Sequence, residues 1–196
     1  MRNAVRAAIA ASSIGFASGC AFAPQAVKLS PVIDVEQSSV GANHAVRVNV
    51  VDERPKSTLG TRGARGVGAE LTLEGDLAEI VRTSLSNGLA LKGFTAQSIK
   101  GAEGRELRVE IRSLDYGVTV GFWSGDLRTQ CSLKAICIRG SDRPYEKLHR
   151  GEFKENVQVV QGAEANNVYV SNALSEALNN VLADGELMEC LAQQGS

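Results

Sequence analysis

Residues 105–120 read RELRVEIRSLDYGVTV, a stretch in which apolar and polar side chains alternate almost throughout. The apolar residues of its first half share one phase of a two-residue period: Leu107, Val109 and Ile111. Those of its second half share the opposite phase: Leu114, Tyr116, Val118 and Val120. A strand carries successive side chains on opposite faces, so the change of phase requires one extra residue. We therefore expect a β-bulge near Arg112 and Ser113.

Two more alternating runs follow, each separated from the previous one by turn-forming residues. Residues 122–126 (FWSGD) predict a hairpin tip, and Gly140-Ser141-Asp142 turns the chain again. The apolar positions of the return run are Leu127, Cys131, Leu133 and Cys137, and those of the third run are Tyr145, Phe153, Val157 and Val159. Three such runs joined by turns predict an antiparallel meander.

Helical patterns flank the meander on both sides. Asp76 is followed three residues later by an acid, which is typical of a helix N-cap, and Lys92-Gly93 is typical of the helix end. A second amphipathic pattern covers residues 165–183, and residues 186–193 can add a short last helix. Short extended stretches occur around Val46–Val50, Leu71–Leu73 and Phe94–Ile99. We expect an α+β fold, a two-layer sandwich with an antiparallel sheet and two main helices on one face.

The N-terminus has the layout of a secretory signal. Arg2 and Arg6 precede about eleven small and apolar residues, too few for a membrane span of roughly 20. Residues 17–20 (ASGC) then place a cysteine after small residues, as in the lipobox of bacterial lipoproteins, which predicts diacylation of Cys20. An ordinary signal peptide with an unmodified Cys20 is the alternative, because lipoboxes usually carry Leu where this chain has Ala17.

Composition indicates three segments in the chain and limits the kinds of partner that it can bind. We expect a signal peptide over residues 1–19, a lipidated tether over 20–44 and one periplasmic α+β domain over 45–196. Removing residues 1–19 leaves 19 basic against 22 acidic residues, a net charge of −3. A near-neutral chain without a basic face gives no support for nucleic-acid binding. The expected partners are a membrane, through the lipid, and an unknown envelope protein; self-association stays open.

Three cysteines besides Cys20 allow at most one internal disulfide. Cys131 and Cys137 are six positions apart on one predicted strand, about 20 Å, which is beyond disulfide reach. Either can pair with Cys190 if the last helix lies over that strand. The alternative that we favour from sequence alone is three buried thiols.

The densest charged loop, residues 52–68, is the first candidate contact site. Its candidate residues are Asp52, Arg54, Arg62 and Arg65, and its glycines could let backbone amides approach an anion. The alternative is an ion-paired strand exit without a ligand. Trp123 at the hairpin tip is the second candidate, either as an aromatic anchor for a partner or a lipid, or packed on its own strand.

Catalytic and metal chemistry lack sequence support. The only histidines are His44 and His149, neither near a nucleophile motif such as Gly-x-Ser-x-Gly, and no Cys-x-x-Cys or Cys/His cluster occurs. We therefore expect no enzyme, no cofactor and no metal.

Several short motifs together resemble one family. They are the lipobox, Val50-Val51-Asp52-x-Arg54, Leu59-Gly60-x-Arg62, and a Leu-rich helix closing in Lys92-Gly93-Phe94. With them the chain resembles the YajG family of bacterial lipoproteins, which implies an outer-membrane lipoprotein facing the periplasm, with no established activity. Ala21 after the cysteine, where Asp is absent, is similar to the pattern exported to the outer membrane. We expect a non-enzymatic interaction or accessory module of the envelope; the alternative is a binding protein for a small anionic or lipid ligand.

Overall fold

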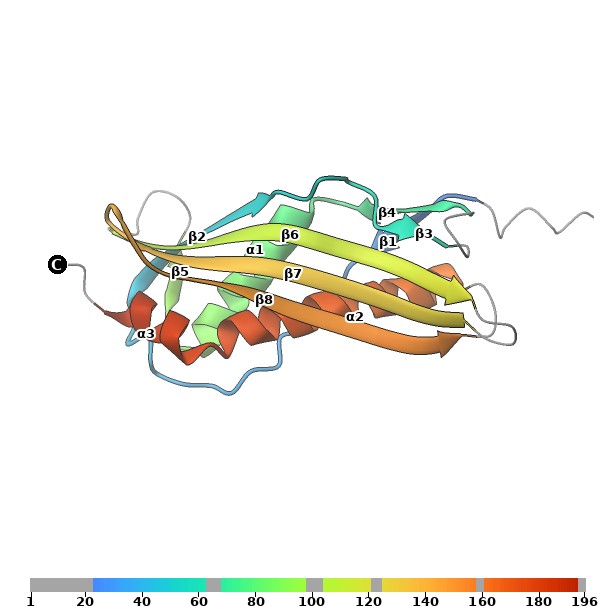
Figure 1. Cartoon of the computed structure of the whole chain (residues 1–196). Helices are drawn as coiled ribbons and strands as arrows, with labels where there is room; N and C mark the ends of the chain where they lie inside the picture. Colours follow the sequence, from blue (N-terminus) through green and yellow to red (C-terminus); the bar gives the residue numbers. More distant parts are fainter. Residues whose placement is uncertain (1–22, 63–67, 98–103, 121–124, 158–160, 194–196) are drawn as a thin grey trace, which may run out of the picture.

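The computed structural model describes residues 23–62, 68–97, 104–120, 125–157 and 161–193 (Figure 1). Their strands are β1 (Gln25–Lys28), β2 (Ala45–Asp52), β3 (Gly60–Thr61), β4 (Glu70–Glu74), β5 (Thr95–Gln97), β6 (Arg105–Val120), β7 (Gly125–Arg139) and β8 (Asp142–Val157). Their helices are α1 (Leu77–Leu91), α2 (Ala163–Leu182) and α3 (Gly185–Ala192). The strands form one eight-stranded sheet, so the α+β class is confirmed.

The meander exists as predicted. β6 pairs antiparallel with β7, and β7 pairs antiparallel with β8. The register of β6 shifts between Ile111 and Ser113, which confirms the bulge that the change of phase predicts. Because of the extra residue, Leu107 and Tyr116 both face the core although they lie on opposite phases.

Most other strand pairs are parallel, so the prediction of an antiparallel sheet is wrong outside the meander, where only β3 and β4 of the described strands pair antiparallel. β2 is parallel to β6 and to β5, and β1 is parallel to β4. Parallel neighbours need a long crossover, and α1 supplies it between β2 and β5. The sheet is therefore mixed. The alternating sequence did not predict this, because alternation shows that a strand has two faces but not which way its neighbour runs.

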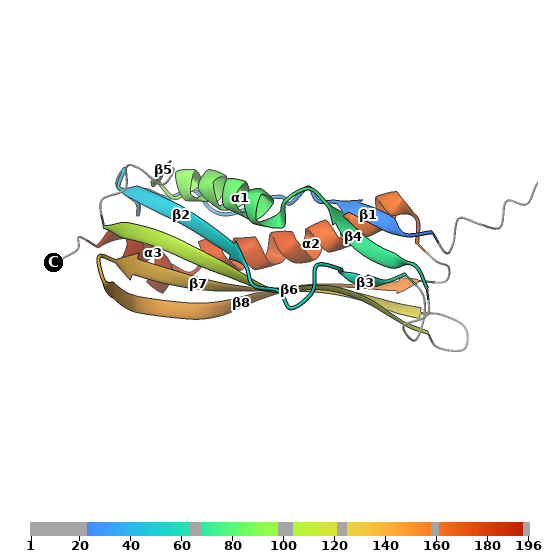
Figure 2. The same ribbon diagram turned by 90° about the horizontal axis from the view of Figure 1, so that it is seen from above.

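The two long helices lie on the same side of the sheet, as Figure 2 shows: α2 packs on β7 and β8, whereas α1 packs on β2, β5 and α2. Asp76 caps α1 as predicted, since its side chain accepts hydrogen bonds from the backbone of Ala78 and Glu79. The helices approach closely at Gly88, where a Cβ would overlap the side chain of Leu182. Fully buried leucines from both helices form the centre of the core: Leu85, Leu89, Leu174 and Leu178.

Gly151 sets the distance between α2 and the sheet. A Cβ at this position of β8 would overlap the carbonyl oxygen of Ala173 and the backbone nitrogen of Ala177. Both are backbone atoms of α2, which cannot rotate away as a side chain can. A glycine is therefore needed where the helix crosses the outermost strand of the meander.

Residues 28–34, which we call the strap, lie along α2 and differ from the predicted tether. Backbone N–H groups of alternate strap residues donate to side-chain oxygens of α2 residues spaced four apart: Lys28 to Asn167 (2.9 Å), Ser30 to Ser171 (3.0 Å), Val32 to Ser175 (2.9 Å) and Asp34 to Asn179 (3.0 Å). Two extended residues advance about 6.6 Å and four helical residues about 6 Å, so the two series stay in step. The chain is thus part of the domain from Gln25 onward.

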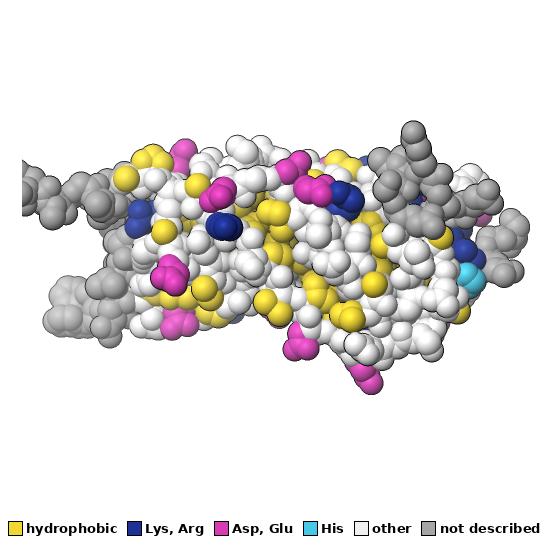
Figure 3. All heavy atoms as spheres, turned by 180° about the vertical axis from the view of Figure 1, so that it is seen from behind, with side chains coloured by type: hydrophobic (Ala, Val, Ile, Leu, Met, Phe, Trp, Pro, Cys, Tyr) yellow, Lys and Arg dark blue, Asp and Glu magenta, His cyan; other side chains and the backbone are white. Residues whose placement is uncertain are grey.

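The segment after the strap is fastened to the end of α1. The backbone of Ser38 donates to Leu91 (3.0 Å), and that of Gly41 donates to Lys92 (2.9 Å). On this helix side of the molecule charged side chains are scattered over the face, and apolar atoms gather in its middle (Figure 3). The outer face of the sheet instead carries ion pairs, among them Arg47–Glu106, Arg108–Glu110, Arg112–Glu110, Lys134–Glu146 and Arg128–Glu152.

One disulfide joins α3 to the sheet. Cys137 of β7 and Cys190 of α3 are bonded, with 6.4 Å between their Cα atoms. The interpretation of three free buried thiols is therefore wrong for these two, because α3 lies over the end of β7 and brings its cysteine within reach. Cys131 remains a free buried thiol, and burial raises its pKa to about 12. None of the described helices is both long and apolar enough to cross a membrane.

Candidate functional site

The predicted arginine loop begins with a tight ion pair. Arg54 donates from Nε to Asp52 Oδ1 (2.9 Å) and from Nη2 to Asp52 Oδ2 (2.8 Å). The Arg54 side chain is only 6% exposed, and its Nη1 has no hydrogen-bond partner. Burial acts to raise the pKa of Asp52, but the hydrogen bonds from Arg54 outweigh it, and the pKa is lowered. Most of the donor capacity of Arg54 is therefore used inside the loop.

Arg62 has different partners from Arg54. Its guanidinium donates to the carbonyl oxygens of Ala23 (3.3 Å) and Gln161 (2.8 Å). It thus fastens the start of the described chain to the segment before α2. The other predicted site residues, Cys20, Arg65 and Trp123, lie outside the described residues.

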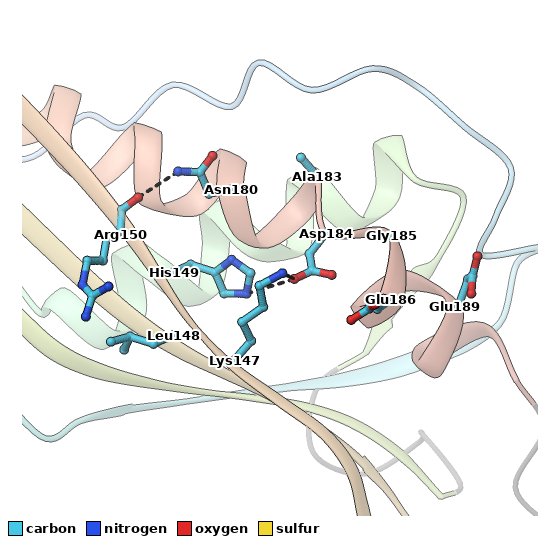
Figure 4. Close-up of a pocket in the computed structure, with 10 residues that line it drawn as sticks. All are labelled: Lys147, Leu148, His149, Arg150, Asn180, Ala183, Asp184, Gly185, Glu186 and Glu189. Atoms are coloured by element: carbon cyan, nitrogen blue, oxygen red, sulfur yellow. Dashed lines mark hydrogen bonds and ion pairs between the residues drawn. The ribbon is translucent and has the colours of Figure 1, made fainter.

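A polar depression that the sequence does not predict lies where β8 meets the junction of α2 and α3 (Figure 4). Its volume is about 680 Å³. The lining residues come from these three elements: Lys147, Leu148, His149, Arg150, Asn180, Ala183, Asp184, Gly185, Glu186 and Glu189. The depression is bounded by charged groups, some of them paired with each other and some not.

Asp184 is the buried centre of this depression. Its Oδ2 accepts from the Tyr145 hydroxyl (2.7 Å) and lies 3.0 Å from Lys147 Nζ. Its Oδ1 accepts from the backbone of Leu187 (3.2 Å) and so caps α3. Burial acts to raise the pKa of Asp184, but these hydrogen bonds outweigh it, and the pKa is lowered. Burial first, and then the bond to Asp184, raises the pKa of Tyr145 to about 12.

His149 lies beside Asp184 but is not hydrogen-bonded to it. Its Nε2 is 3.5 Å from Asp184 Oδ2 and has no hydrogen-bond partner, although the side chain is only 5% exposed. Burial lowers the pKa of His149 more than the neighbouring carboxylate raises it. The imidazole is therefore neutral at neutral pH, with one buried nitrogen facing the polar depression.

The outer edge of β8 borders the same depression. In the described sheet β8 pairs only with β7, so its other edge has no strand neighbour. Side chains of α2 occupy part of that edge: Asn180 donates to the Arg150 carbonyl (2.8 Å), and Glu176 accepts from the Glu152 backbone (2.7 Å). α2 ends at Leu182, and nearer the depression the edge passes Leu148, which is 39% exposed.

Metal binding has no support in the described part of the chain. It contains no group of three or more His, Cys, Asp or Glu side chains placed to hold an ion. Sequence reasoning missed the depression because its lining comes from two separate stretches, Lys147–Arg150 and Asn180–Glu189. These stretches are 30 or more positions apart in the sequence. The only local signal is Asp184-Gly185, which lies between the helical pattern predicted over residues 165–183 and the short last helix predicted over 186–193.

These features define a class: a small α+β domain with a mixed sheet, preceded by a lipoprotein-type leader. The chain belongs to the family described as "Uncharacterized lipoprotein" (Lipoprotein_16), whose profile matches residues 31–192. The lipoprotein part of the predicted resemblance is thereby confirmed. No curated protein matches the chain.

Solved structures similar to this chain come from several bacteria. Protein XCC0632 from Xanthomonas campestris is 13% identical, with a TM-score of 0.49, over 86% of this chain and 92% of that one. A neuraminyllactose-binding hemagglutinin homolog from Helicobacter pylori is 11% identical, with a TM-score of 0.45, over 82% and 95%. A minor lipoprotein from Acinetobacter baumannii is 6% identical, with a TM-score of 0.42, over 72% and 87%.

Proposed function

We propose that this protein is an outer-membrane lipoprotein that faces the periplasm and acts, without catalysis, by binding an extended segment of another envelope protein. Membership of a lipoprotein family supports the lipid anchor, for which Cys20 is the acceptor. Ala21 after Cys20 supports export to the outer membrane through the resemblance to the YajG family. The anchor carries acyl chains such as palmitate, and each buried methylene contributes about 0.8 kcal/mol to membrane binding.

The open edge of β8 beside the polar depression is the observation that carries the binding proposal. An extended peptide can add to such an edge through its backbone, while alternate side chains enter neighbouring pockets. β8 offers an edge past the end of α2, and the depression lies next to it. Leu148 adds an exposed apolar contact at the same place.

The charges around the depression indicate the chemistry of the partner. Lys147 is paired with Asp184, whereas Glu186 and Glu189 are exposed on α3 and have no ion pair among the described residues. Two carboxylates one helical turn apart can share a guanidinium or ammonium group. We therefore propose that the partner segment carries a basic residue at this end.

Photo-crosslinking in intact envelopes tests this proposal. A photoreactive amino acid at Leu148 should capture one discrete partner, and the same group at Asn172, which is exposed on α2, should not. The double substitution Glu186→Lys and Glu189→Lys should then reduce capture at position 148 about tenfold or more, because charge-assisted hydrogen bonds are worth about 1.5–3 kcal/mol. Equal capture at both positions, or capture that the charge reversal leaves unchanged, would contradict the proposal.

The anchor has its own test. Cys20→Ser should abolish incorporation of labelled fatty acid and lipoprotein processing, because a hydroxyl is a far poorer acyl acceptor than a thiolate. Labelled fatty acid on the Cys20→Ser protein would show that the lipobox interpretation is wrong. Separation of inner and outer membranes of cells producing the unaltered protein tests the proposed location.

A small-anion site at Arg54 is the second candidate, and the unpartnered Nη1 of this buried guanidinium favours it. A neighbouring depression of about 360 Å³ is lined in part by Arg54, Ser57 and Thr72. Arg54→Lys keeps a charge but loses the planar fork, so it should weaken binding of phosphate while Arg62→Lys does not. A lipid between helices and sheet has less support, since the leucines that face each other there, Leu85, Leu89, Leu174 and Leu178, are fully buried in the core.

A further inference from the structure

The described part of the chain begins only three residues after the proposed lipid acceptor. Three residues span at most about 11 Å when fully extended. Ala23 is already held by Arg62, and β1 pairs with β4 from Gln25 onward. We infer that the end of the domain where β1 and α2 begin, which we call the anchor pole, rests against the lipid surface. This inference depends on the proposed acylation of Cys20.

The anchor pole is built from several separate segments. Arg62 joins Ala23 to Gln161, which lies two residues before α2. Asn166 in the first turns of α2 accepts a hydrogen bond from the Tyr116 hydroxyl (3.0 Å) and donates to Gln25 Oε1 (3.0 Å). These contacts fix the beginning of the chain to both layers of the domain, so an anchor there would hold the whole domain and not only a loose segment.

The ends of the meander strands lie at the same pole. In the pairing register Val120 of β6 is opposite Gly125 of β7, and Gly125 is opposite Val157 of β8. Figure 1 shows these strand ends and the start of β1 at one end of the elongated molecule, with α3 at the other. A bilayer that contacts the start of β1 would therefore face the ends of three long strands.

The length of α2 separates this pole from the polar depression. α2 begins beside Gln161 and its 20 residues extend about 30 Å to the junction with α3. A domain with a 25-residue tether could turn freely on the membrane, whereas a span of about 11 Å cannot carry α3 down to the lipid. The short anchor therefore presents the depression and the adjoining edge of β8 away from the membrane, where a periplasmic partner can reach them.

Two labelling positions on α2 test the orientation. Glu164→Cys, near the pole, and Ala183→Cys, near the depression, are both exposed and lie about 28 Å apart along one helix. The acylated protein is placed in phosphatidylethanolamine–phosphatidylglycerol vesicles whose headgroups carry a fluorescence quencher. A fluorophore at position 164 should be quenched several-fold more strongly than one at position 183. The protein without added cysteine controls for labelling of buried Cys131.

Equal quenching at the two positions, or stronger quenching at 183, would overturn the inference. A flexible Gly/Ser insertion of about 20 residues after Ala21 adds a root-mean-square reach of about 25 Å and should remove most of the difference. A difference that survives the insertion would show that the short anchor does not set the orientation. Flotation with the vesicles tests the anchor separately from the orientation. Protein that fails to float contradicts the lipid anchor. Protein that floats but shows equal quenching at positions 164 and 183 contradicts only the orientation.

Discussion

The bonds between the strap and α2 allow a sharp test, because single atoms can be removed from them. Ser171→Ala deletes the oxygen that accepts from the Ser30 backbone at 3.0 Å. Ser175→Ala deletes an oxygen that accepts from Val32 at 2.9 Å and donates to the Ser171 carbonyl at 2.7 Å. Neither change removes apolar contact of any size, so the effect reports the hydrogen bonds.

The two positions should differ in magnitude. Ser171 is buried, and water cannot easily replace its bond to Ser30, so its loss should cost about 1–1.5 kcal/mol. The bond from Val32 is exposed, and its loss should cost about 0.5 kcal/mol. Alanine also favours a helix by up to about 0.5 kcal/mol over serine, which offsets part of both losses. We expect a net destabilisation for Ser171→Ala and almost none for Ser175→Ala.

Amide hydrogen exchange measures this locally. A loss of about 1 kcal/mol should speed exchange at Ser30 about fivefold. Asn172→Ala is the matched control, because Asn172 lies between the two serines on α2, is exposed, and reports the helix-propensity gain alone. Exchange at Ser30 that is the same in Ser171→Ala as in Asn172→Ala would refute the reasoning and show that α2 does not hold the strap.

Three further outcomes follow from the core, the disulfide and the buried histidine. Leu85→Asp should lower the free energy of unfolding by several kcal/mol because it buries an unpaired carboxylate, whereas Asn87→Asp on the exposed side of α1 should not. An unchanged melting temperature of the Leu85→Asp protein would contradict the packing of this face of α1 in the core. Cys190→Ser should cost about 2–4 kcal/mol in urea unfolding, and reduction of the unaltered protein should cost the same. Because burial lowers the folded-state pKa of His149, the free energy of unfolding should fall as the pH drops below about 6.5. His149→Gln should flatten that decline. An equal dependence of stability on pH in both proteins would show that His149 does not cause it.

Local chemistry predicts the elements well. The phase change around Arg112 predicts the bulge, and Asp76 predicts the start of α1, because both depend on residues within a few positions of each other. The leader pattern and short motifs predict a lipoprotein, and the family match confirms it. The candidate site is predicted less well: Asp52 and Arg54 form a pair two positions apart, but Cys20, Arg65 and Trp123 lie outside the described residues.

The sequence by itself determined the long strands of the meander, the helices, the bulge and the lipoprotein class, since each follows from neighbouring side chains and their periodicity. Only the tertiary structure decided that β2 runs parallel to β6 and that Cys190 forms its disulfide with Cys137. It also decided that part of the predicted tether, residues 28–34, is hydrogen-bonded to α2. The strap bonds join residues 139 to 145 positions apart. Such contacts leave no local pattern, because an Asn or Ser on a helix surface looks the same whether it faces water or a distant backbone N–H. The polar depression has the same origin: His149 and Asp184 become neighbours only when α2 has packed on β8 and turned into α3.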